Sequence, residues 1–364
     1  MEAADEQAVD TLTLSLGTVD GVRLLSHRPS VLFKVERYAT EPPAGDIAVE
    51  GLRIAGPGWD ERLRDLLAAL SPNERASLFA VRIHDRHGLP MPAKTVLDRA
   101  RTDWFPKFLS LGQLTPVFQP IYDLRGGRVY GREALVRGRM GKSEVRGSEL
   151  LEAAEVHDAI YSFDTRARAI ALEVGLPRLP ENEVLFVNLD PRGVVDVESS
   201  LKSVWPAVER AGATGTSVGL ELTHVERATE IDVLEQLVRA HRARGAVIAV
   251  DHLSAGGESL RVLEALKPDL AKLDISLCKG IELSSGRRKL VSALVEVAHE
   301  LSCRVVATGI ERDSELESVR DVGVDFVQGF FVGQPNEEML PVDERILDQR
   351  PSGVRTESGI HTIR

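Results

Sequence analysis

The stretch from Ala246 to Gly257, AVIAVDHLSAGG, constrains the fold more than any other part of this chain. Its first residues are apolar and rich in β-branched side chains, and the run ends abruptly at the acid Asp251. Such an uninterrupted apolar run predicts a strand buried on both faces, which is typical of a parallel sheet covered by helices. In α/β barrels, side chains at the carboxyl ends of the strands carry the chemistry, so Asp251 is a candidate site residue.

From Thr115 onward, strand-like apolar runs alternate with segments of helical periodicity. Many of the repeats are on the order of thirty residues, the length of one β/α unit in an eight-fold barrel. The first connection, Asp123–Arg128, has only hairpin length and predicts one antiparallel strand. We therefore predict an α/β fold, a modified (β/α)8 TIM-like barrel with one antiparallel strand. The predicted strands are Val117–Tyr122, Val129–Val136, Val184–Leu189, Val218–Leu222, Ala246–Asp251, Leu270–Asp274, Arg304–Thr308 and Phe326–Gln328.

The residues before the barrel predict a separate and smaller α+β module. Alternating runs predict strands at Val31–Tyr38, Ile47–Ala55 and Leu78–His84, and the periodic segment Trp59–Leu70 predicts a helix. No metal-ligand spacing, phosphate loop or nucleophile motif occurs there, so the role of the module stays open. The predicted organisation is an N-terminal module at residues 1–92, a linking helix at 93–112, the barrel at 113–340 and a partly disordered C-terminal tail at 341–364.

Composition excludes several classes of protein. A hydrophobic content of 43% and a charged content of 28% are typical of a globular protein, and no apolar run is long enough to span a membrane. The acidic start MEAADEQAVD is unlike a signal peptide. The chain has only two cysteines, Cys278 and Cys303, so a disulfide framework is not expected. A cytoplasmic location is expected instead. A net charge of −11 argues against binding to DNA.

Polar side chains close most of the predicted barrel strands. Because the carboxyl ends of parallel strands meet at one mouth of a barrel, these side chains are expected to converge. Crowded carboxylates repel one another unless a cation binds, and oxygen-rich clusters suit Mg²⁺, Mn²⁺ or Ca²⁺. Each residue taken singly would equally suit a solvated strand end or a helix cap, but seven in register favour a site. They are Glu133, Asn188, Glu221, Asp251, Lys272, Thr308 and Gln328.

These residues lie in motifs that resemble, in the same order, those of the EAL-domain cyclic-di-GMP phosphodiesterases. The matching segments are FQPIYDLRGGRVYGREALVRG, LFVNLDP, VGLELT, AVDHLSAGGESLRVLEALKPDLAKLDISL, VVATGIE and GVDFVQGFFVGQP, between about Leu111 and Pro335. The N-terminal module is outside this resemblance. The resemblance implies a modified barrel with an antiparallel strand, and hydrolysis of cyclic-di-GMP to linear pGpG with two Mg²⁺ or Mn²⁺ ions.

The resemblance also implies roles for individual residues. Lys272 would help to position the attacking water and to stabilise charge near the phosphate. Arg137 suits a phosphate because its guanidinium offers a fork of donors, although an ion pair at the barrel rim is the alternative. By the same resemblance, one metal would be held by Glu133, Asn188, Glu221 and Asp251, and the ligand would be contacted by Gln119, Arg137 and Gln328.

Three positions depart from the family pattern. His252 stands where active members carry a second Asp, Thr308 replaces a Glu that serves the second metal, and His224 replaces a Glu that supports the loop after Asp251. Replacing two acids by neutral side chains removes the charge that lets two divalent cations coexist. His252 would suit Mn²⁺ or Zn²⁺, or be a loop histidine without a metal, and Thr308 would suit a bond to neighbouring backbone.

These departures predict a degenerate EAL-domain protein that is a cyclic-di-GMP receptor or a protein-interaction module with weak or no hydrolysis. One Mg²⁺ or Mn²⁺ site is expected, and the second is doubtful. One alternative is an active metal-dependent phosphodiesterase that forms pGpG. Another is a structural scaffold that binds no nucleotide. A homodimer and an unidentified protein partner are compatible with every one of these hypotheses.

Overall fold

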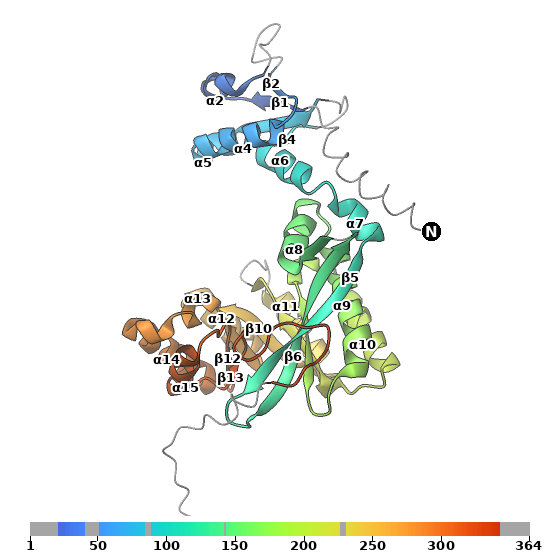
Figure 1. The fold of residues 1–364 in the computed structure, drawn as a ribbon, viewed down its shortest axis with the longest axis vertical. Coiled ribbons are helices and arrows are strands. Elements are labelled where there is room, and N and C mark those ends of the chain that lie inside the picture. Colours follow the sequence, from blue (N-terminus) through green and yellow to red (C-terminus); the bar gives the residue numbers. More distant parts are fainter. Residues whose placement is uncertain (1–20, 41–50, 84–88, 142, 226–230, 343–364) are drawn as a thin grey trace, which may run out of the picture. The chain divides into compact units, whose positions relative to one another are not determined.

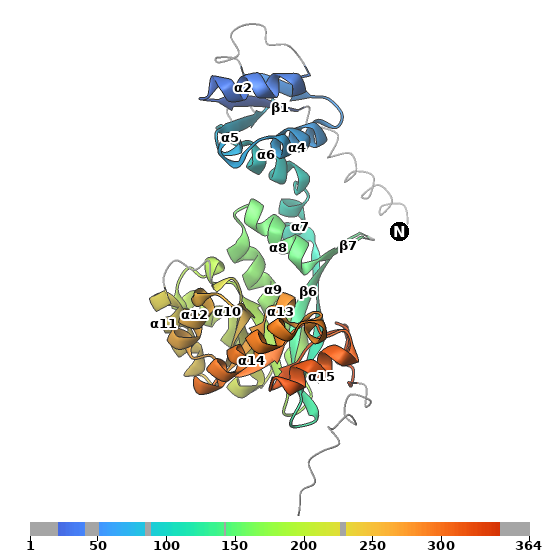
Figure 2. The ribbon, with the colours of Figure 1, turned by 90° about the vertical axis from the view of Figure 1, so that its left-hand side faces the viewer.

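The computed structural model describes residues 21–40, 51–83, 89–141, 143–225 and 231–342. The chain divides into two compact units, which are described separately. The first comprises Met1–Gln113 and Gly138–Phe163, and the second comprises Leu114–Arg137 and Asp164–Arg364. Almost all of the predicted C-terminal tail lies outside the described residues. Figures 1 and 2 show the elements of both units.

The N-terminal part of the first unit is a four-stranded sheet with helices on both faces. The strand order is β2-β1-β3-β4, and β1 pairs antiparallel with both β2 and β3. Figure 2 shows α2 on one side of β1 and α4, α5 and α6 on the other. The bounds are β1 Gly21–Ser26, α2 Pro29–Val35, β2 Leu52–Ala55, α4 Trp59–Ala69, α5 Pro72–Ala76, β3 Leu78–Arg82, β4 Met91–Pro92 and α6 Ala93–Arg101.

One predicted strand of this module is wrong. The segment Val31–Tyr38 forms most of helix α2 and a short 3-10 turn, Glu36–Tyr38. Pro29 occupies the first turn of the helix, where its fixed φ favours helical geometry. Val31, Leu32 and Val35 are buried together, a spacing that fits one helical face as well as it fits a strand. The start of the predicted strand Ile47–Ala55 and the last residue of the predicted strand Leu78–His84 lie outside the described residues.

Residues 93–112 contain two helices. Helix α6 is followed by a turn at residues 102–104 and then by α7, Phe105–Leu111. Thr102 Oγ1 donates to the Asp98 carbonyl oxygen at 2.7 Å, and Pro106 lies in the first turn of α7. A hydroxyl that satisfies a last-turn carbonyl, followed by proline, favours a new helix over continuation of the old one. The first unit also contains strand β7, Ser143–Arg146, and helix α8, Gly147–Val156.

Eight strands form a closed barrel, as predicted. The order is β5-β13-β12-β11-β10-β9-β8-β6, and a further pairing between β5 and β6 closes the ring. β5 pairs antiparallel with β13, while β6, β8, β9 and β10 are mutually parallel neighbours, so the predicted antiparallel strand is confirmed. The bounds are β5 Gln113–Asp123, β6 Arg128–Met140, β8 Val184–Leu189, β9 Val218–Leu222, β10 Val247–Leu253, β11 Leu270–Leu273, β12 Arg304–Ala307 and β13 Phe326–Val327.

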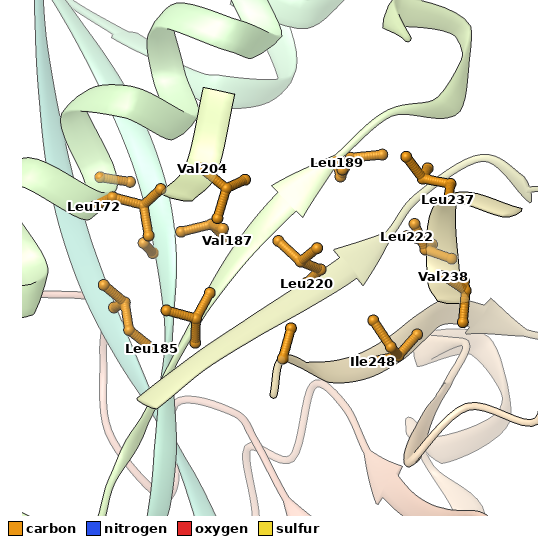
Figure 3. Close-up of a cluster of buried hydrophobic side chains, with 14 of the residues drawn as sticks. Leu172, Leu185, Val187, Leu189, Val204, Leu220, Leu222, Leu237, Val238 and Ile248 are labelled. Atoms are coloured by element: carbon orange, nitrogen blue, oxygen red, sulfur yellow. The ribbon is translucent and has the colours of Figure 1, made fainter. Parts of the chain in front are cut away.

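Alternation along the barrel strands separates the hydrophobic layer from the interior. Leu185, Val187 and Leu189 of β8 pack outward in one cluster with Leu220 and Leu222 of β9, against the surrounding helices (Figure 3). Because successive side chains of a strand point to opposite faces, Asn188 and Glu221 are left on the inner face. The helices are α9 Ile160–Gly175, α10 Val197–Arg210, α11 Ile231–Arg242, α12 Gly257–Leu266, α13 Ile275–Cys278, α14 Ser285–Glu300 and α15 Asp313–Asp321.

None of the helices in the described part of the chain combines the length and the apolar character needed to cross a membrane.

His241 of α11 makes the barrel's stability depend on pH. It is fully buried, accepts a hydrogen bond from Trp205 Nε1 at Nδ1, 3.2 Å away, and contacts Ser200 Oγ through Nε2 at 3.0 Å. Burial, followed by repulsion from Arg168 and Arg244, lowers the pKa of His241 from 6.5 to about 4. Because only the unfolded state takes up the proton between these values, stability is lost as the pH falls through that window.

We therefore expect the free energy of unfolding to fall by on the order of 3 kcal/mol between about pH 6.5 and pH 4 through His241 alone. Urea denaturation at several pH values measures this change in the free energy of unfolding. His241→Gln is the matched control, since glutamine offers one acceptor and one donor but does not titrate. Equal pH slopes for the two proteins would show that His241 is not the titrating group.

Candidate functional site

The site is built around Lys272 of β11. Its side chain is 3% exposed, and Nζ lies 2.6 Å from both Glu133 Oε2 of β6 and Glu221 Oε1 of β9. Burial disfavours the ammonium form, but Glu133, Glu221 and Asp251 outweigh burial and raise the pKa of Lys272 above its usual range. Lys272 is therefore a permanent positive charge inside the barrel mouth.

Glu221 has one oxygen without a partner. Its side chain is 1% exposed, and among the described residues no hydrogen-bond donor contacts Oε2. Burial, together with repulsion from Glu133 and Asp251, raises the pKa of Glu221 well above its ordinary value, against the opposing effect of Lys272. A buried carboxylate oxygen with no donor is costly unless a proton or cation binds it, so this oxygen marks a place for one.

Two amide side chains contact Glu133, and a third contacts one of those two. Gln328 Nε2 donates to Glu133 Oε2 at 2.7 Å and to Gln119 Oε1 at 3.2 Å, and Asn188 Nδ2 lies 3.4 Å from Glu133 Oε1. Gln119 in turn donates to the Gly333 carbonyl oxygen at 3.2 Å. The structure thus brings together five predicted residues, and three of them, Lys272, Gln328 and Asn188, donate toward the carboxylate of Glu133.

Asp251 is engaged by its own neighbour. The distance from His252 Nδ1 to Asp251 Oδ2 is 2.6 Å. Burial opposes ionisation of Asp251, but Lys272 and the His252 hydrogen bond outweigh it and lower the pKa of Asp251. The same hydrogen bond raises the pKa of His252. His252 therefore acts as a hydrogen-bond donor to Asp251.

His252 and His224 form a stacked pair. Their ring centroids are 6.4 Å apart with 24° between the planes, and both residues adopt left-handed backbone, with φ of 60° and 53°. Histidine is among the few non-glycine residues that tolerate this region. His224 Nδ1 lies 3.3 Å from Asp190 Oδ2, which is also bound by Arg192 at 2.7 Å. Two of the three residues predicted to depart from the family pattern are therefore neighbours in the structure.

The other two predicted residues make local contacts. Thr308 Oγ1 donates to the Leu273 carbonyl oxygen at 2.7 Å. This is the hydrogen bond to neighbouring backbone that the sequence analysis gave as one interpretation of Thr308. Arg137 Nη1 donates to the Val136 carbonyl oxygen at 2.9 Å. Neither contact requires a ligand.

A cavity of about 280 Å³ opens at this mouth. Its lining includes seven predicted residues, but Arg137, Asn188, Glu221 and His224 are not among them. Sequence analysis missed the other lining residues, of which only Leu273, Gly309 and Gly329 directly follow a residue that it had selected. The lining consists of Gln119, Glu133, Leu135, Asp251, His252, Lys272, Leu273, Asp274, Ile275, Thr308, Gly309, Glu311, Gln328, Gly329 and Phe330.

Carboxylate oxygens are the candidate cation ligands at this mouth. Glu133, Glu221 with its unpartnered oxygen and Asp251 are oxygen donors of the kind that Mg²⁺ and Mn²⁺ prefer. Within the described residues, no three Asp, Glu, His or Cys side chains already converge as a formed metal cluster. His252 and Thr308 are bonded within the chain and add no carboxylate for a second ion.

Comparison with known sequences decides the family. The sequence model described as the EAL domain matches residues 102–335, well over half of the chain. The chain belongs to the EAL domain family. The motif Glu133-Ala134-Leu135 that gives the family its name lies on β6 and supplies the carboxylate next to Lys272.

Two curated relatives show how far this EAL domain has diverged. The blue light- and temperature-regulated antirepressor BluF of Escherichia coli is 23% identical over 212 residues, which cover 58% of this chain and 52% of BluF. The cyclic di-GMP phosphodiesterase NbdA of Pseudomonas aeruginosa is 29% identical over 232 residues, covering 61% of this chain and 29% of NbdA. The chain thus spans about half or less of each of these relatives.

A solved structure supports the fold. The YkuI protein of Bacillus subtilis, crystallised with cyclic-di-GMP and calcium, superposes with a TM-score of 0.58. It is 22% identical and covers 67% of this chain and 62% of its own. At this identity the likeness concerns the barrel of the EAL domain and not its activity.

We expect Lys272→Met to lower the free energy of unfolding by about 3–5 kcal/mol, because Glu133 and Glu221 would lose their buried counter-ion. Urea denaturation at about pH 7 measures this loss of unfolding free energy, with EDTA present to remove divalent metal ions. The double variant Lys272→Met with Glu221→Gln also removes one carboxylate and should recover part of the loss. A loss below about 1 kcal/mol for Lys272→Met would contradict a central role for the ion pairs.

Proposed function

We propose that this EAL domain is a cyclic-di-GMP receptor or interaction module with weak or no hydrolysis. The observation that carries the proposal is the asymmetry of the barrel mouth. Glu133, Glu221 and Lys272 form a buried charged array, whereas His252 and Thr308 are each hydrogen-bonded within the chain. The choice of ligand is supported by NbdA, named a cyclic di-GMP phosphodiesterase, and by YkuI, crystallised with cyclic-di-GMP and calcium.

Different residues would contact different parts of the ligand and the metal ion. Lys272 provides a fixed positive charge, Arg137 would bind a phosphate, and Gln119 and Gln328 would hold the ligand near Glu133. One divalent ion, Mg²⁺ or Mn²⁺, would be held by Glu133, Asn188, Glu221 and Asp251. When bound, that ion would supply Lewis-acid polarisation of the phosphate oxygens.

The same array explains why turnover would be poor. A buried lysine with a raised pKa stays protonated, so Lys272 can orient a water molecule through its charge but cannot remove a proton from it. His252 is held by Asp251, and Thr308 is a neutral donor to backbone. Neither side chain supplies a second carboxylate to activate water.

Purified protein is expected to bind cyclic-di-GMP with a Kd in the micromolar range or tighter, and to form little pGpG with Mg²⁺ or Mn²⁺. Calorimetry measures binding, and chromatography measures the linear product. Glu133→Gln is the matched control for any product that arises at this site. Rapid product formation that disappears in Glu133→Gln would favour the active phosphodiesterase instead, and the absence of binding would favour the scaffold.

Restoring both acids tests the explanation for weak hydrolysis. The double variant His252→Asp with Thr308→Glu is expected to raise the rate of pGpG formation by at least about tenfold, because it returns two carboxylates. Aspartate and asparagine tolerate the left-handed backbone at position 252, so His252→Asn with Thr308→Gln is the matched uncharged control. Equal rates in both double variants would show that missing acids do not limit hydrolysis.

A further inference from the structure

An ion pair is buried on α9, beside the end of β8. Asp164 and Arg168 lie one helical turn apart in the barrel unit, and Arg168 Nη1 donates to Asp164 Oδ2 at 2.6 Å. Their side chains are 9% and 2% exposed. Replacing such a pair by hydrophobic residues of similar volume is often neutral for stability, because taking two charges out of water is costly. Packing alone therefore does not explain the pair.

Both members of the pair also bind backbone at the end of β8. Arg168 Nη1 donates to the Asn188 carbonyl oxygen at 2.9 Å. Asp164 Oδ1 accepts a hydrogen bond from Asp190 N at 3.4 Å. These two backbone groups lie on either side of Leu189, which is fully buried in the outward-facing cluster (Figure 3). Because buried backbone groups need partners, α9 holds the chain immediately before and after Leu189.

The guanidinium of Arg168 is supported from α10 as well. Arg168 Nε donates to Ser203 Oγ at 3.1 Å, and the same hydroxyl donates to the Ser200 carbonyl oxygen at 2.7 Å. A donor that is held by several partners before a ligand arrives keeps its own geometry. Arg168 therefore presents a fixed donor to the backbone of Asn188.

The end of β8 extends beyond part of its sheet pairing. The register with β6 runs from Val184 to Val187, whereas the register with β9 continues to Leu189. Asn188 thus lies one residue past the pairing with β6, the strand that carries Glu133. Its Nδ2 atom is 3.4 Å from Glu133 Oε1, a distance at which a small displacement ends a hydrogen bond. The position of the Asn188 side chain therefore depends on what holds its backbone.

We propose that Asp164 and Arg168 are positioning residues that fix the end of β8, and thereby the Asn188 side chain, for a divalent cation at the barrel mouth. The inference rests on the proposed function and adds to it the residues that orient one of its cation ligands. Neither residue would touch the ion. Loss of a group that orients a metal ligand commonly lowers metal affinity by about 10- to 100-fold.

The test is the affinity for Mn²⁺ alone, measured from the electron paramagnetic resonance signal of the free ion. Arg168→Met is expected to weaken binding by about tenfold or more. Because this variant leaves Asp164 buried without its counter-ion, it is compared with the double variant Asp164→Leu with Arg168→Met, which removes both charges and fills their space with apolar side chains. The double variant should keep the circular dichroism of the wild type and also bind Mn²⁺ about tenfold more weakly or worse.

A second arm separates the positioning of Asn188 from a general loss of structure. In an Asn188→Ala protein, the same double change should alter the Mn²⁺ affinity by less than about twofold, because the side chain that the pair positions is already absent. Ser203→Ala is the matched control, since it removes the Nε contact of Arg168 and leaves both backbone contacts in place. It should bind Mn²⁺ within about twofold of the wild type.

Equal Mn²⁺ affinities of the wild type and the double variant would overturn the positioning role and leave the proposed cation site intact. A loss of undiminished size in the Asn188→Ala background would also overturn it, because the pair would then act on another part of the site. A wild-type protein that binds no Mn²⁺ would overturn the cation site of the proposed function and this inference together.

Discussion

The ammonium group of Lys272, enclosed between Glu133 and Glu221, is the interaction on which the barrel mouth depends. Each partner comes from a different strand, and all three side chains are almost fully buried. None of them would be tolerable there alone, because an isolated buried charge costs several kcal/mol. Their mutual contacts make the inner face of β6, β9 and β11 a polar site within an otherwise apolar barrel.

The carboxylates of Glu133 and Asp251 have different hydrogen-bond partners in this site. On the Glu133 side, Gln328 and Asn188 add further donors around one carboxylate. On the Asp251 side, His252 supplies the donor, and His224 stacks on the imidazole ring. One oxygen of Asp251 is therefore contacted from within the chain by the residue that follows it.

The strand ends supply the charged and amide groups of the site, and the residues after them include apolar lining residues. The strand ends carry the ionised and amide groups, which need a rigid scaffold because their energies depend steeply on distance. The following residues include Ile275 and Phe330, which line the cavity and are largely exposed. Gly309 allows the close approach of the Ile275 side chain, and Gly329 allows that of the Ile310 backbone.

The barrel could be predicted from the sequence because its signals are local. Apolar strand runs, helical periodicity and the short connection after Asp123 each follow from side-chain burial along one element. The inward phase of Asn188 and Glu221 could likewise be predicted, since alternation places them opposite the outward leucines of the same strands. The segment Val31–Tyr38 shows the limit of this reasoning, because its short apolar pattern fits either element and packing against the N-terminal sheet selected the helix.

The sequence by itself predicted seven of the residues that line the cavity at the mouth of the barrel, and its motifs indicated the family that the match to residues 102–335 shows. Only the tertiary structure decided how those residues are paired between strands: Lys272 with two glutamates, and Thr308 with the backbone of Leu273. The reason is that pairing depends on distances between strands far apart in the chain. Those distances are set by closure of the barrel, which no local pattern encodes.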